Sequence, residues 1–396
     1  MKEISKIAAA VQASTTLKVD ALFKQMKADG KDVVGFGAGE PDFDTPDNIK
    51  DAAYTAIRDG QTKYTPSNGI PALRQAAADR LLADCGVKYS PSQIVIASGA
   101  KHNIYIALQT LLDTGDEVIL PAPYWVTYAE AIRMSGGVPV AVSASEQSDF
   151  KITKDQLESA VTEKTKLFIL NNPSNPTGML YNADELRALA EVCVKHDLYI
   201  MSDEIYYKLV YDGKTFTSIA ALGEDVKART IIVNGVSKSY AMTGWRIGYT
   251  ASDAKIAEVM SNYLSHSTSS PSTISQLAAV EALSGPQDGI LAMRDIFEQR
   301  RDYIVEHVNA IEGVSCRKPD GAFYVMINIE KLIGRTLGGK VINSSDDFSL
   351  AFLESGLVAV VSCDGFGCRN FVRMTYAASM ESIKEGLARL EKFVSA

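Results

Sequence analysis

The stretch that decides the fold is residues 234–249, which read Asn-Gly-Val-Ser-Lys-Ser-Tyr-Ala-Met-Thr-Gly-Trp-Arg-Ile-Gly-Tyr. It follows an apolar, strand-like run at residues 230–233 and turns at Gly235. Lys238 therefore lies on a tight turn after a buried strand, where an amine is poorly solvated and costs less to hold uncharged. An uncharged amine can form an imine with an aldehyde.

Lys238 and Arg246, eight residues apart, point to one cofactor. Pyridoxal phosphate (PLP) is the aldehyde cofactor that proteins usually hold through an imine with a lysine, and an arginine suits its phosphate. The alternative is a surface lysine with an ordinary ion-pair arginine, which is the commoner situation for an isolated lysine. The hypothesis therefore depends on partners for the rest of the cofactor.

Composition and charge argue against several classes of protein. A chain of 396 residues is too long for one core, so we expect two domains. A net charge of -8 without a basic stripe argues against a nucleic-acid surface. No apolar run approaches the length of a membrane span, and residues 1–20 lack the pattern of a signal peptide.

Cysteine and histidine usage favours a reduced, cytoplasmic protein without a metal site. The five cysteines are an odd number and form no Cys-x-x-Cys motif. The four histidines are too scattered to suggest a metal centre. Cys363 and Cys368 flank a glycine-rich turn, and we interpret both as free thiols.

Two segments supply partners for a phosphate and for a flat ring. A strand at residues 93–97 passes through Ser-Gly-Ala-Lys into a helix at residues 102–112, and such a turn offers unpaired N–H groups to an anion. A plain strand-to-helix connection is equally common. Trp125 follows a strand at residues 117–120, where ligands of open α/β sheets bind, and its indole can stack on a heteroaromatic ring. A core tryptophan is the alternative.

The strongest support comes from two consecutive buried strands. The strand at residues 166–171 runs into Asn-Pro-Ser-Asn-Pro-Thr-Gly, and the next strand ends in Asp203. A carboxylate there is costly unless it is paired, and a pyridinium N–H would pair it. Tyr206 and Asn175 can both donate hydrogen bonds to a phenolate oxygen. Taken separately these three are a helix cap, a core ring and a turn residue. Together with the lysine they match each polar atom of PLP.

With these segments in place, the chain resembles the class I aminotransferases of PLP fold type I, and among them the bacterial aspartate aminotransferases. The segments that carry the resemblance span nearly the whole chain in the family's order: Gly39-Glu40-Pro41, Tyr64-Thr65-Pro66, Pro123-Tyr124-Trp125, and residues 172–178, 202–206, 237–238, 243–246 and 372–377. The resemblance implies an α/β fold, with a large domain built on a mostly parallel sheet and a smaller α/β domain.

The resemblance also implies a role for each residue around the cofactor. Lys238, Asp203 and Tyr206 would be catalytic: the imine-forming lysine, the partner of the ring nitrogen and a donor to the phenolate oxygen. Asn175 would share that oxygen, and Trp125 would stack on the ring. The phosphate would be bound by Gly99, Ala100, Lys101, Ser237, Arg246 and, from the neighbouring subunit, Tyr64.

On the substrate side, the resemblance implies contacts with Gly39, Trp125, Asn175 and Arg373. Arg373 would hold the α-carboxylate in a bidentate fork, which suits a guanidinium better than an ammonium. The shared phosphate site implies a homodimer. The expected reaction is a ping-pong transfer of an amino group from an L-amino acid, with aspartate favoured, to a 2-oxo acid, with 2-oxoglutarate favoured.

Substrate choice leaves alternatives open. Many aspartate-using relatives place a partner-subunit arginine near the loop that corresponds to residues 265–275, and this sequence has none there. Lys101 or the hydroxyls of Thr15 and Thr16 would then read a distal carboxylate, or the donor is a neutral or aromatic amino acid. A PLP-dependent carbon–sulfur β-lyase is a further alternative. A PLP-sensing regulator would need a DNA-binding module ahead of the family segments, which begin near residue 35.

The expected domains are an arm at residues 1–45 that joins the small domain, a large PLP-binding domain at residues 46–285 and a small domain at residues 286–396. We expect a long helix around residues 256–264 to join them.

Two glycine-containing segments resemble nucleotide-binding motifs but lack essential parts of them. The glycines at 35, 37 and 39 lack the third glycine spacing and the helix of a dinucleotide site. Residues 334–340 fit a P-loop, but Val341 replaces its Ser or Thr.

Overall fold

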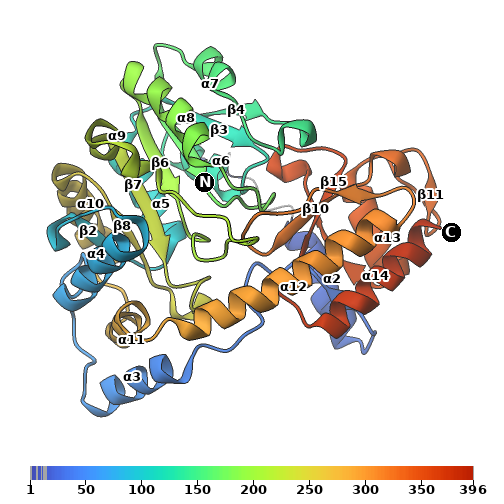
Figure 1. Cartoon of the computed structure of the whole chain (residues 1–396), viewed down its shortest axis with the longest axis horizontal. Coiled ribbons are helices and arrows are strands. Elements are labelled where there is room, and N and C mark those ends of the chain that lie inside the picture. Colours follow the sequence, from blue (N-terminus) through green and yellow to red (C-terminus); the bar gives the residue numbers. More distant parts are fainter. Residues whose placement is uncertain (1, 6–7, 10, 12–15, 396) are drawn as a thin grey trace.

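A seven-stranded sheet forms the centre of the larger half of the molecule (Figure 1). The computed structural model describes residues 2–5, 8–9, 11 and 16–395. The strand order is β2-β8-β7-β6-β5-β3-β4, with β8 antiparallel to both neighbours and every other pair parallel. The strands are β2 (Ile94–Ala97), β3 (Glu117–Ala122), β4 (Val138–Ser143), β5 (Thr165–Asn171), β6 (Tyr199–Asp203), β7 (Thr230–Gly235) and β8 (Gly248–Ala251).

Helices cover both faces of this sheet, which is why its central strands read as continuous apolar runs. Successive residues of β7 point to opposite faces. Ile231 packs with α5 (Ala100–Leu111) and α10 (Ala254–Ser267), and Ile232 packs with α4 (Pro71–Cys85) and α11 (Thr273–Ser284). The helices of this half are α3 (Asp47–Arg58), α4 (Pro71–Cys85), α5 (Ala100–Leu111), α6 (Thr127–Met134), α7 (Lys154–Ala160), α8 (Ala183–Lys195), α9 (Glu224–Arg229), α10 (Ala254–Ser267) and α11 (Thr273–Ser284).

Local sequence sets where these helices begin. Before α8, the Asn182 side chain accepts hydrogen bonds from the N–H groups of Asp184 and Glu185, at 3.0 and 2.9 Å. The Glu185 carboxylate accepts in return from the Asn182 N–H at 2.8 Å. This reciprocal cap satisfies N–H groups that have no partner inside the helix.

A four-stranded antiparallel sheet of order β14-β15-β10-β9 organises the smaller half. The N-terminal segment joins this half, because β1 pairs in parallel with β13 and Met26 of α2 packs against Leu353 and Ala359. The elements are α2 (Thr16–Ala28), β1 (Val34–Gly35), α12 (Asp288–Ala310), β9 (Ser315–Cys316), β10 (Tyr324–Asn328), β11 (Thr336–Leu337), β12 (Lys340–Val341), α13 (Ser345–Gly356), β13 (Val358–Ala359), β14 (Val361–Ser362), β15 (Phe371–Thr375) and α14 (Met380–Val394).

The helix that joins the two halves is α12, so the prediction that a helix around residues 256–264 does so is wrong. All four buried residues of α10 belong to the core beneath the large sheet. In α12, Ile290 packs in the large half, whereas Phe297 and Val308 pack in the small half (Figure 1). Both helices have apolar faces, and the surface that a face covers is not encoded in its own spacing.

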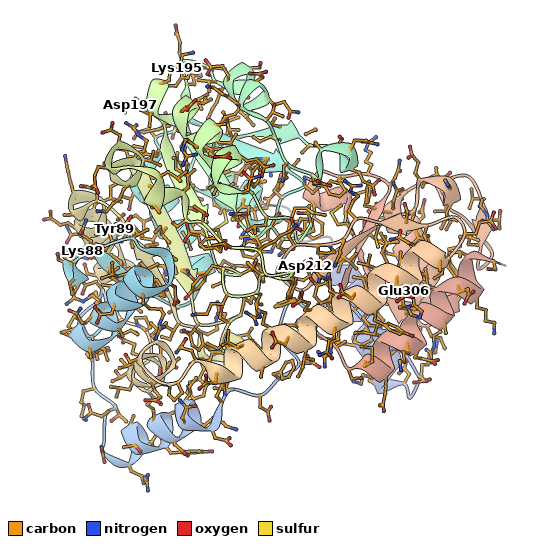
Figure 2. All side chains as sticks on the ribbon, in the orientation of Figure 1. Lys88, Tyr89, Lys195, Asp197, Asp212 and Glu306 are labelled. Atoms are coloured by element: carbon orange, nitrogen blue, oxygen red, sulfur yellow. The ribbon has the colours of Figure 1, made fainter. Side chains whose placement is uncertain are left out.

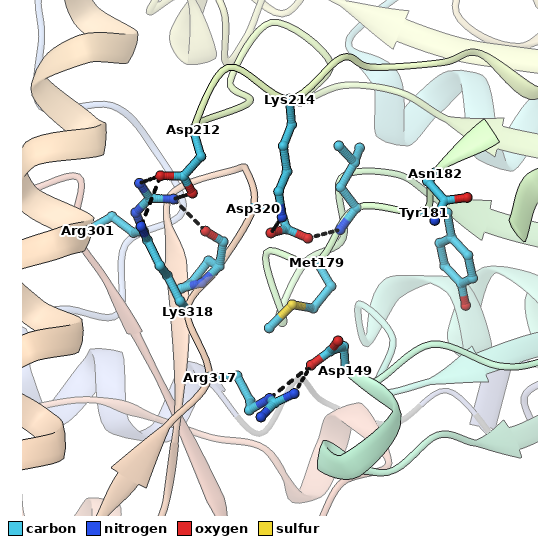
Figure 3. Close-up of polar contacts among 12 residues, drawn as sticks. Asp149, Met179, Tyr181, Asn182, Asp212, Lys214, Arg301, Arg317, Lys318 and Asp320 are labelled. Carbon is cyan, nitrogen blue, oxygen red and sulfur yellow. Dashed lines mark hydrogen bonds and ion pairs between the residues drawn. The ribbon is translucent and has the colours of Figure 1, made fainter. Parts of the chain in front are cut away.

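Ion pairs connect the two halves. Asp212 lies between them (Figure 2), and its carboxylate accepts two hydrogen bonds from Arg301 of α12, at 2.8 and 3.0 Å. Two further pairs cross the same boundary (Figure 3): Lys214 with Asp320, and Asp149 with Arg317. These contacts hold the small half against one edge of the large sheet.

Over the described part of the chain, every helix falls short of the length or the apolar composition needed to cross a bilayer.

One close backbone approach gives a test of the fold. A Cβ added at Gly248 of β8 would lie 2.3 Å from the backbone nitrogen of Ala100, where α5 begins. We expect Gly248→Ala to lower the free energy of unfolding by about 3 kcal/mol, because the backbone at that point cannot move aside. Denaturant unfolding of the two proteins measures this difference.

The matched control is Gly289→Ala. Gly289 lies in the exposed first turn of α12, and an added Cβ would meet no atom within 4 Å. This variant should be as stable as the parent or slightly more stable, because alanine favours a helix. Equal stability of Gly248→Ala and Gly289→Ala would contradict the close approach of β8 to α5.

Candidate active site

Two ionisable side chains meet where the parallel strands end. Asp203 is the last residue of β6, and Lys238 lies three residues beyond the neighbouring strand β7. The Lys238 ammonium donates a hydrogen bond to the carbonyl oxygen of Gly39, which follows β1 of the small half. Residues from both halves therefore meet at the carboxyl edge of the sheet, where open α/β folds bind ligands.

The environment of Lys238 favours its uncharged form. The pKa of Lys238 is lowered to about 8, mainly by burial and in part by the positive charges of Arg246 and Arg373. Glu40 and Asp203 act in the opposite direction. A lysine with this pKa holds a useful fraction of free amine near neutral pH, which both a nucleophile and a general base require.

Asp203 is a buried carboxyl, only 3% exposed. Burial raises its pKa to about 6, and hydrogen bonds from the Tyr128 hydroxyl and the Ile205 N–H oppose this rise. The Tyr128 hydroxyl donates to Oδ2 at 2.6 Å, and the Ile205 N–H donates to Oδ1 at 3.2 Å. Tyr128 was not predicted from the sequence. Its one signal was a place on the helix that follows Trp125.

An anion cradle forms where α5 begins. Gly99 precedes the helix with a positive φ of 89°, and the first N–H groups of a helix have no partner within it. Arg246 packs against this turn so closely that a Cβ at Gly99 would lie 2.3 Å from its Nη2. Lys101 places its ammonium 4.8 Å from the centre of the Trp125 ring. Positive charge, helix N-terminus and glycine together suit a phosphate.

Arg373 of β15 is held rigidly while one of its donors stays unused. Nη1 donates to Asn175 Oδ1 at 3.0 Å, and Nη2 donates to the Gly37 carbonyl at 2.9 Å. The guanidinium carbon lies 4.4 Å from the centre of the Tyr324 ring. Arg373 is 6% exposed, yet its Nε has no hydrogen-bond partner among the described residues. A buried donor without a partner is costly, so an anionic ligand would be favoured here.

Tyr206 faces a second tyrosine that the sequence analysis also missed. Its hydroxyl lies 3.0 Å from that of Tyr324, which belongs to β10 of the small half. Both rings are buried in the core of the small half. Tyr324 lies in an apolar strand sequence, Ala-Phe-Tyr-Val, which gave no sign that its hydroxyl faces the site.

The structure brings most of the predicted residues together. Contacts or charge interactions link Lys238, Asp203, Arg246, Arg373, Gly39, Asn175, Gly99, Ala100, Lys101 and Trp125, and Tyr206 joins through Tyr324. Ser237 is buried beside the lysine. Tyr64 stands apart, with 96% of its surface exposed. Thr15 and the side chain of Thr16 lie outside the described residues.

These residues fit PLP by their chemistry. Asp203 is a carboxyl buried at a cost, and Lys238 is an amine of lowered pKa. PLP would supply a partner for each of them. The glycine at position 99 keeps open the space against Arg246 that a side chain would fill. Among the described residues, no group of three or more His, Cys, Asp or Glu side chains is arranged to hold a metal ion.

The hydrogen bond from Tyr128 to Asp203 gives a pH-dependent prediction. The pKa of Asp203 is about 6 in the folded protein, above its ordinary value of 3.8. This carboxyl therefore stabilises the fold at low pH, and that contribution is lost as pH rises through about 6. Tyr128→Phe removes a donor to the ionised form. We expect an extra loss of about 2 kcal/mol in unfolding free energy near pH 7.5 that is much smaller near pH 4.5.

Thermal unfolding of the cofactor-free protein across this pH range measures the effect. The control is Tyr181→Phe, because the Tyr181 hydroxyl is also buried but accepts from the Ile152 N–H instead of donating to a carboxylate. Its stability loss should not vary with pH between these values. A Tyr128→Phe loss that is equally independent of pH would show that Asp203 does not depend on this hydroxyl.

Comparison with known proteins identifies the family of this chain. Residues 31–390 match the family described as aminotransferase class I and II. An aspartate aminotransferase of Geobacillus stearothermophilus is 47% identical over 394 residues, covering 100% of this chain and 99% of the relative. An aspartate/prephenate aminotransferase of Cereibacter sphaeroides is 46% identical over 395 residues, covering 99% of each chain.

Solved structures agree with this match. The crystal structure of the aspartate aminotransferase from Rhizobium meliloti superimposes with a TM-score of 0.96 at 41% identity, covering 100% of this chain and 99% of that one. The Thermus thermophilus aspartate aminotransferase with maleate gives a TM-score of 0.93 at 36% identity, covering 99% and 100%. The expected fold type I architecture is therefore confirmed. The chain belongs to the class I and II aminotransferases, which are PLP-dependent enzymes.

Proposed function

We propose that this aminotransferase takes its amino group from L-aspartate and passes it to 2-oxoglutarate in a ping-pong reaction. The observation that carries the proposal is the buried guanidinium of Arg373, clamped by Asn175 and Gly37, with an unused donor beside a lysine whose pKa is about 8. This pairing can hold an α-carboxylate and act on the adjacent Cα. The names of the relatives support aspartate as the donor.

Each predicted residue has a proposed role in holding the cofactor. PLP, when bound, supplies an electron sink for the electrons left when a proton leaves the substrate Cα. Asp203 would hold the ring nitrogen in its protonated form, and Trp125 would cover one face of the ring. The phenolic oxygen would be held by Tyr206 and Asn175, and the phosphate by Gly99, Ala100, Lys101, Ser237 and Arg246.

Proton transfer in this proposal belongs to Lys238. Its Nζ, uncharged in part at neutral pH, would take the proton from the substrate Cα and hold it for return to the reacting atoms. Arg373 limits rotation about the bonds at Cα by gripping the carboxylate, so the proton stays within reach of Nζ. The backbone of Gly39, whose carbonyl accepts a hydrogen bond from Nζ, would lie against the same carboxylate.

For the distal carboxylate of aspartate, we propose Lys101 as one reading group. Its ammonium lies over the Trp125 ring, next to the anion cradle. The segment between α10 and α11 has no arginine that could do this work. A neutral or aromatic donor is the second candidate, since no arginine in this segment is available to read a distal carboxylate.

A donor screen tests the proposal directly. Purified enzyme with PLP should form glutamate from 2-oxoglutarate faster with aspartate than with aromatic or neutral amino acids, measured as kcat/KM. Lys238→Ala should lower kcat by at least about a thousandfold, because both the nucleophile and the base are lost. The matched control is Lys166→Ala, whose lysine pairs with Asp116 near the start of β5 and should keep parental activity.

Three results would count against the proposal. Full transamination by Lys238→Ala would remove the lysine from the mechanism. A higher kcat/KM with an aromatic donor would favour the second candidate. Release of pyruvate and ammonia from a cysteine-type substrate, without an added 2-oxo acid, would favour a carbon–sulfur β-lyase on the same fold.

We further propose a homodimer in which Tyr64 reaches the phosphate site of the neighbouring subunit. Tyr64 is 96% exposed, and Tyr54 and Ile57 on the nearby α3 are 62% and 52% exposed. Large apolar groups exposed together are typical of an interface. The division of the chain at residues 45 and 285 likewise stays a proposal.

Subunit hybrids test the shared site. A purified hybrid of one Lys238→Ala chain and one Tyr64→Ala chain should regain one intact site if Tyr64 serves its neighbour, because both defects then fall in the other site. The hybrid should be more active than either homodimer. A hybrid no better than the Tyr64→Ala homodimer would place Tyr64 in its own subunit's site or in none.

We also infer a cytoplasmic location. Its support is the free state of Cys85, Cys193, Cys316, Cys363 and Cys368 in the structure. Proteins of oxidising compartments commonly pair such residues in disulfides.

A further inference from the structure

Tyr324 is a fully buried tyrosine that contacts both Arg373 and Tyr206. It is 1% exposed and begins β10, which pairs antiparallel with β15. In that register Met326 lies opposite Arg373, so Tyr324 and Arg373 lie diagonally on the same face of the sheet. The guanidinium carbon is accordingly 4.4 Å from the centre of the Tyr324 ring, which is the geometry of a cation–π contact.

The Tyr324 hydroxyl lies against the hydroxyl of Tyr206. The two oxygen atoms are 3.0 Å apart, and the rings meet edge to face at 82°. A hydroxyl has one proton to donate. When Tyr206 donates its proton to a ligand oxygen, the bond between the two tyrosines can persist only with Tyr324 as the donor. A chain of donors polarises each member, so Tyr324 would strengthen the donation by Tyr206.

A third contact reaches the lysine side of the site. A Cβ added at Gly39 would lie 2.9 Å from the Tyr324 hydroxyl oxygen, so this hydroxyl restricts position 39 to a residue without a side chain. The carbonyl of Gly39 is the acceptor for Lys238 Nζ. The buried Tyr324 side chain therefore lies against three parts of the site: Arg373, Tyr206 and Gly39.

We propose that Tyr324 is a positioning residue that couples the substrate's α-carboxylate site at Arg373 to the cofactor's phenolic oxygen at Tyr206. The ring holds the Arg373 guanidinium in place, and the hydroxyl supports Tyr206 as a donor. This inference rests on the proposed function, because it assigns the two sites by the roles given above. The ring and the hydroxyl of Tyr324 therefore have different roles, which substitutions can separate.

Two variants separate these parts in the cofactor-loaded enzyme. Tyr324→Phe keeps the ring and removes the hydroxyl, whereas Tyr324→Leu removes both. The matched control is Tyr211→Phe, since Tyr211 is buried in the same core and its hydroxyl donates to the Ala322 carbonyl, away from Arg373 and Tyr206. Two readouts are measured: the pH midpoint of the absorbance change of the lysine-bound cofactor, and the dissociation constant of maleate, a dicarboxylate without an amino group.

Tyr324→Phe should raise the pH midpoint by about 0.5 unit, because a weaker donation by Tyr206 stabilises the phenolate less. Its maleate affinity should stay within about twofold of the parent. Tyr324→Leu should raise the midpoint similarly and also weaken maleate binding by about tenfold, because the cation–π contact is lost. Tyr211→Phe should change neither quantity.

The inference is wrong if Tyr324→Phe titrates like the parent, or if Tyr211→Phe shifts the midpoint as much. It is also wrong if Tyr324→Leu binds maleate as tightly as Tyr324→Phe. If Tyr324→Leu does not fold, the phenylalanine variant alone decides through its midpoint. A parent enzyme that shows no lysine-linked absorbance at all would instead overturn the proposed function. The two failures are therefore distinguishable.

Discussion

The removal of Asp203 and Lys238 from water, at one edge of one sheet, is the constraint on which the rest of the site depends. Burial is the largest cause of both pKa shifts, upward to about 6 for the carboxyl and downward to about 8 for the amine. Each group is therefore held closer to neutrality than it would be in solution. A ligand with a protonated ring nitrogen and an aldehyde would relieve both penalties, which accounts for the fit of PLP to this chain.

The topology of the sheet brings these groups together from distant parts of the sequence. Parallel β5, β6 and β7 end at the same edge, so the segments that follow them converge although they are separated by whole crossover helices. The small half closes this edge with β10, β15 and the segment after β1. Ion pairs such as Arg301 with Asp212 hold the two halves together, so Arg373 and Lys238 keep a fixed position relative to each other.

Much of the fold could be predicted because local patterns have local causes. Buried strands of a parallel sheet are continuous apolar runs, and the strand expected at residues 166–171 is observed as Thr165–Asn171. The helix expected from residue 102 begins at Ala100, because Gly99 already takes the position before the first turn. The joining helix was predicted wrongly, since amphipathic spacing shows that a face is buried and leaves open which surface it covers.

By itself the sequence determined which chemical groups are available: a lysine on a glycine turn, a carboxylate after an apolar strand, an arginine in a strand and a phosphate turn. These are local features, because the neighbours that define them are adjacent in the chain. Only the tertiary structure decided that Tyr128 donates to Asp203 and that Tyr324 links Arg373 to Tyr206. The chain has 17 tyrosines, and nothing in their spacing distinguishes these two. A hydrogen bond depends on distance and direction between groups far apart in sequence, and those exist only once both cores have packed.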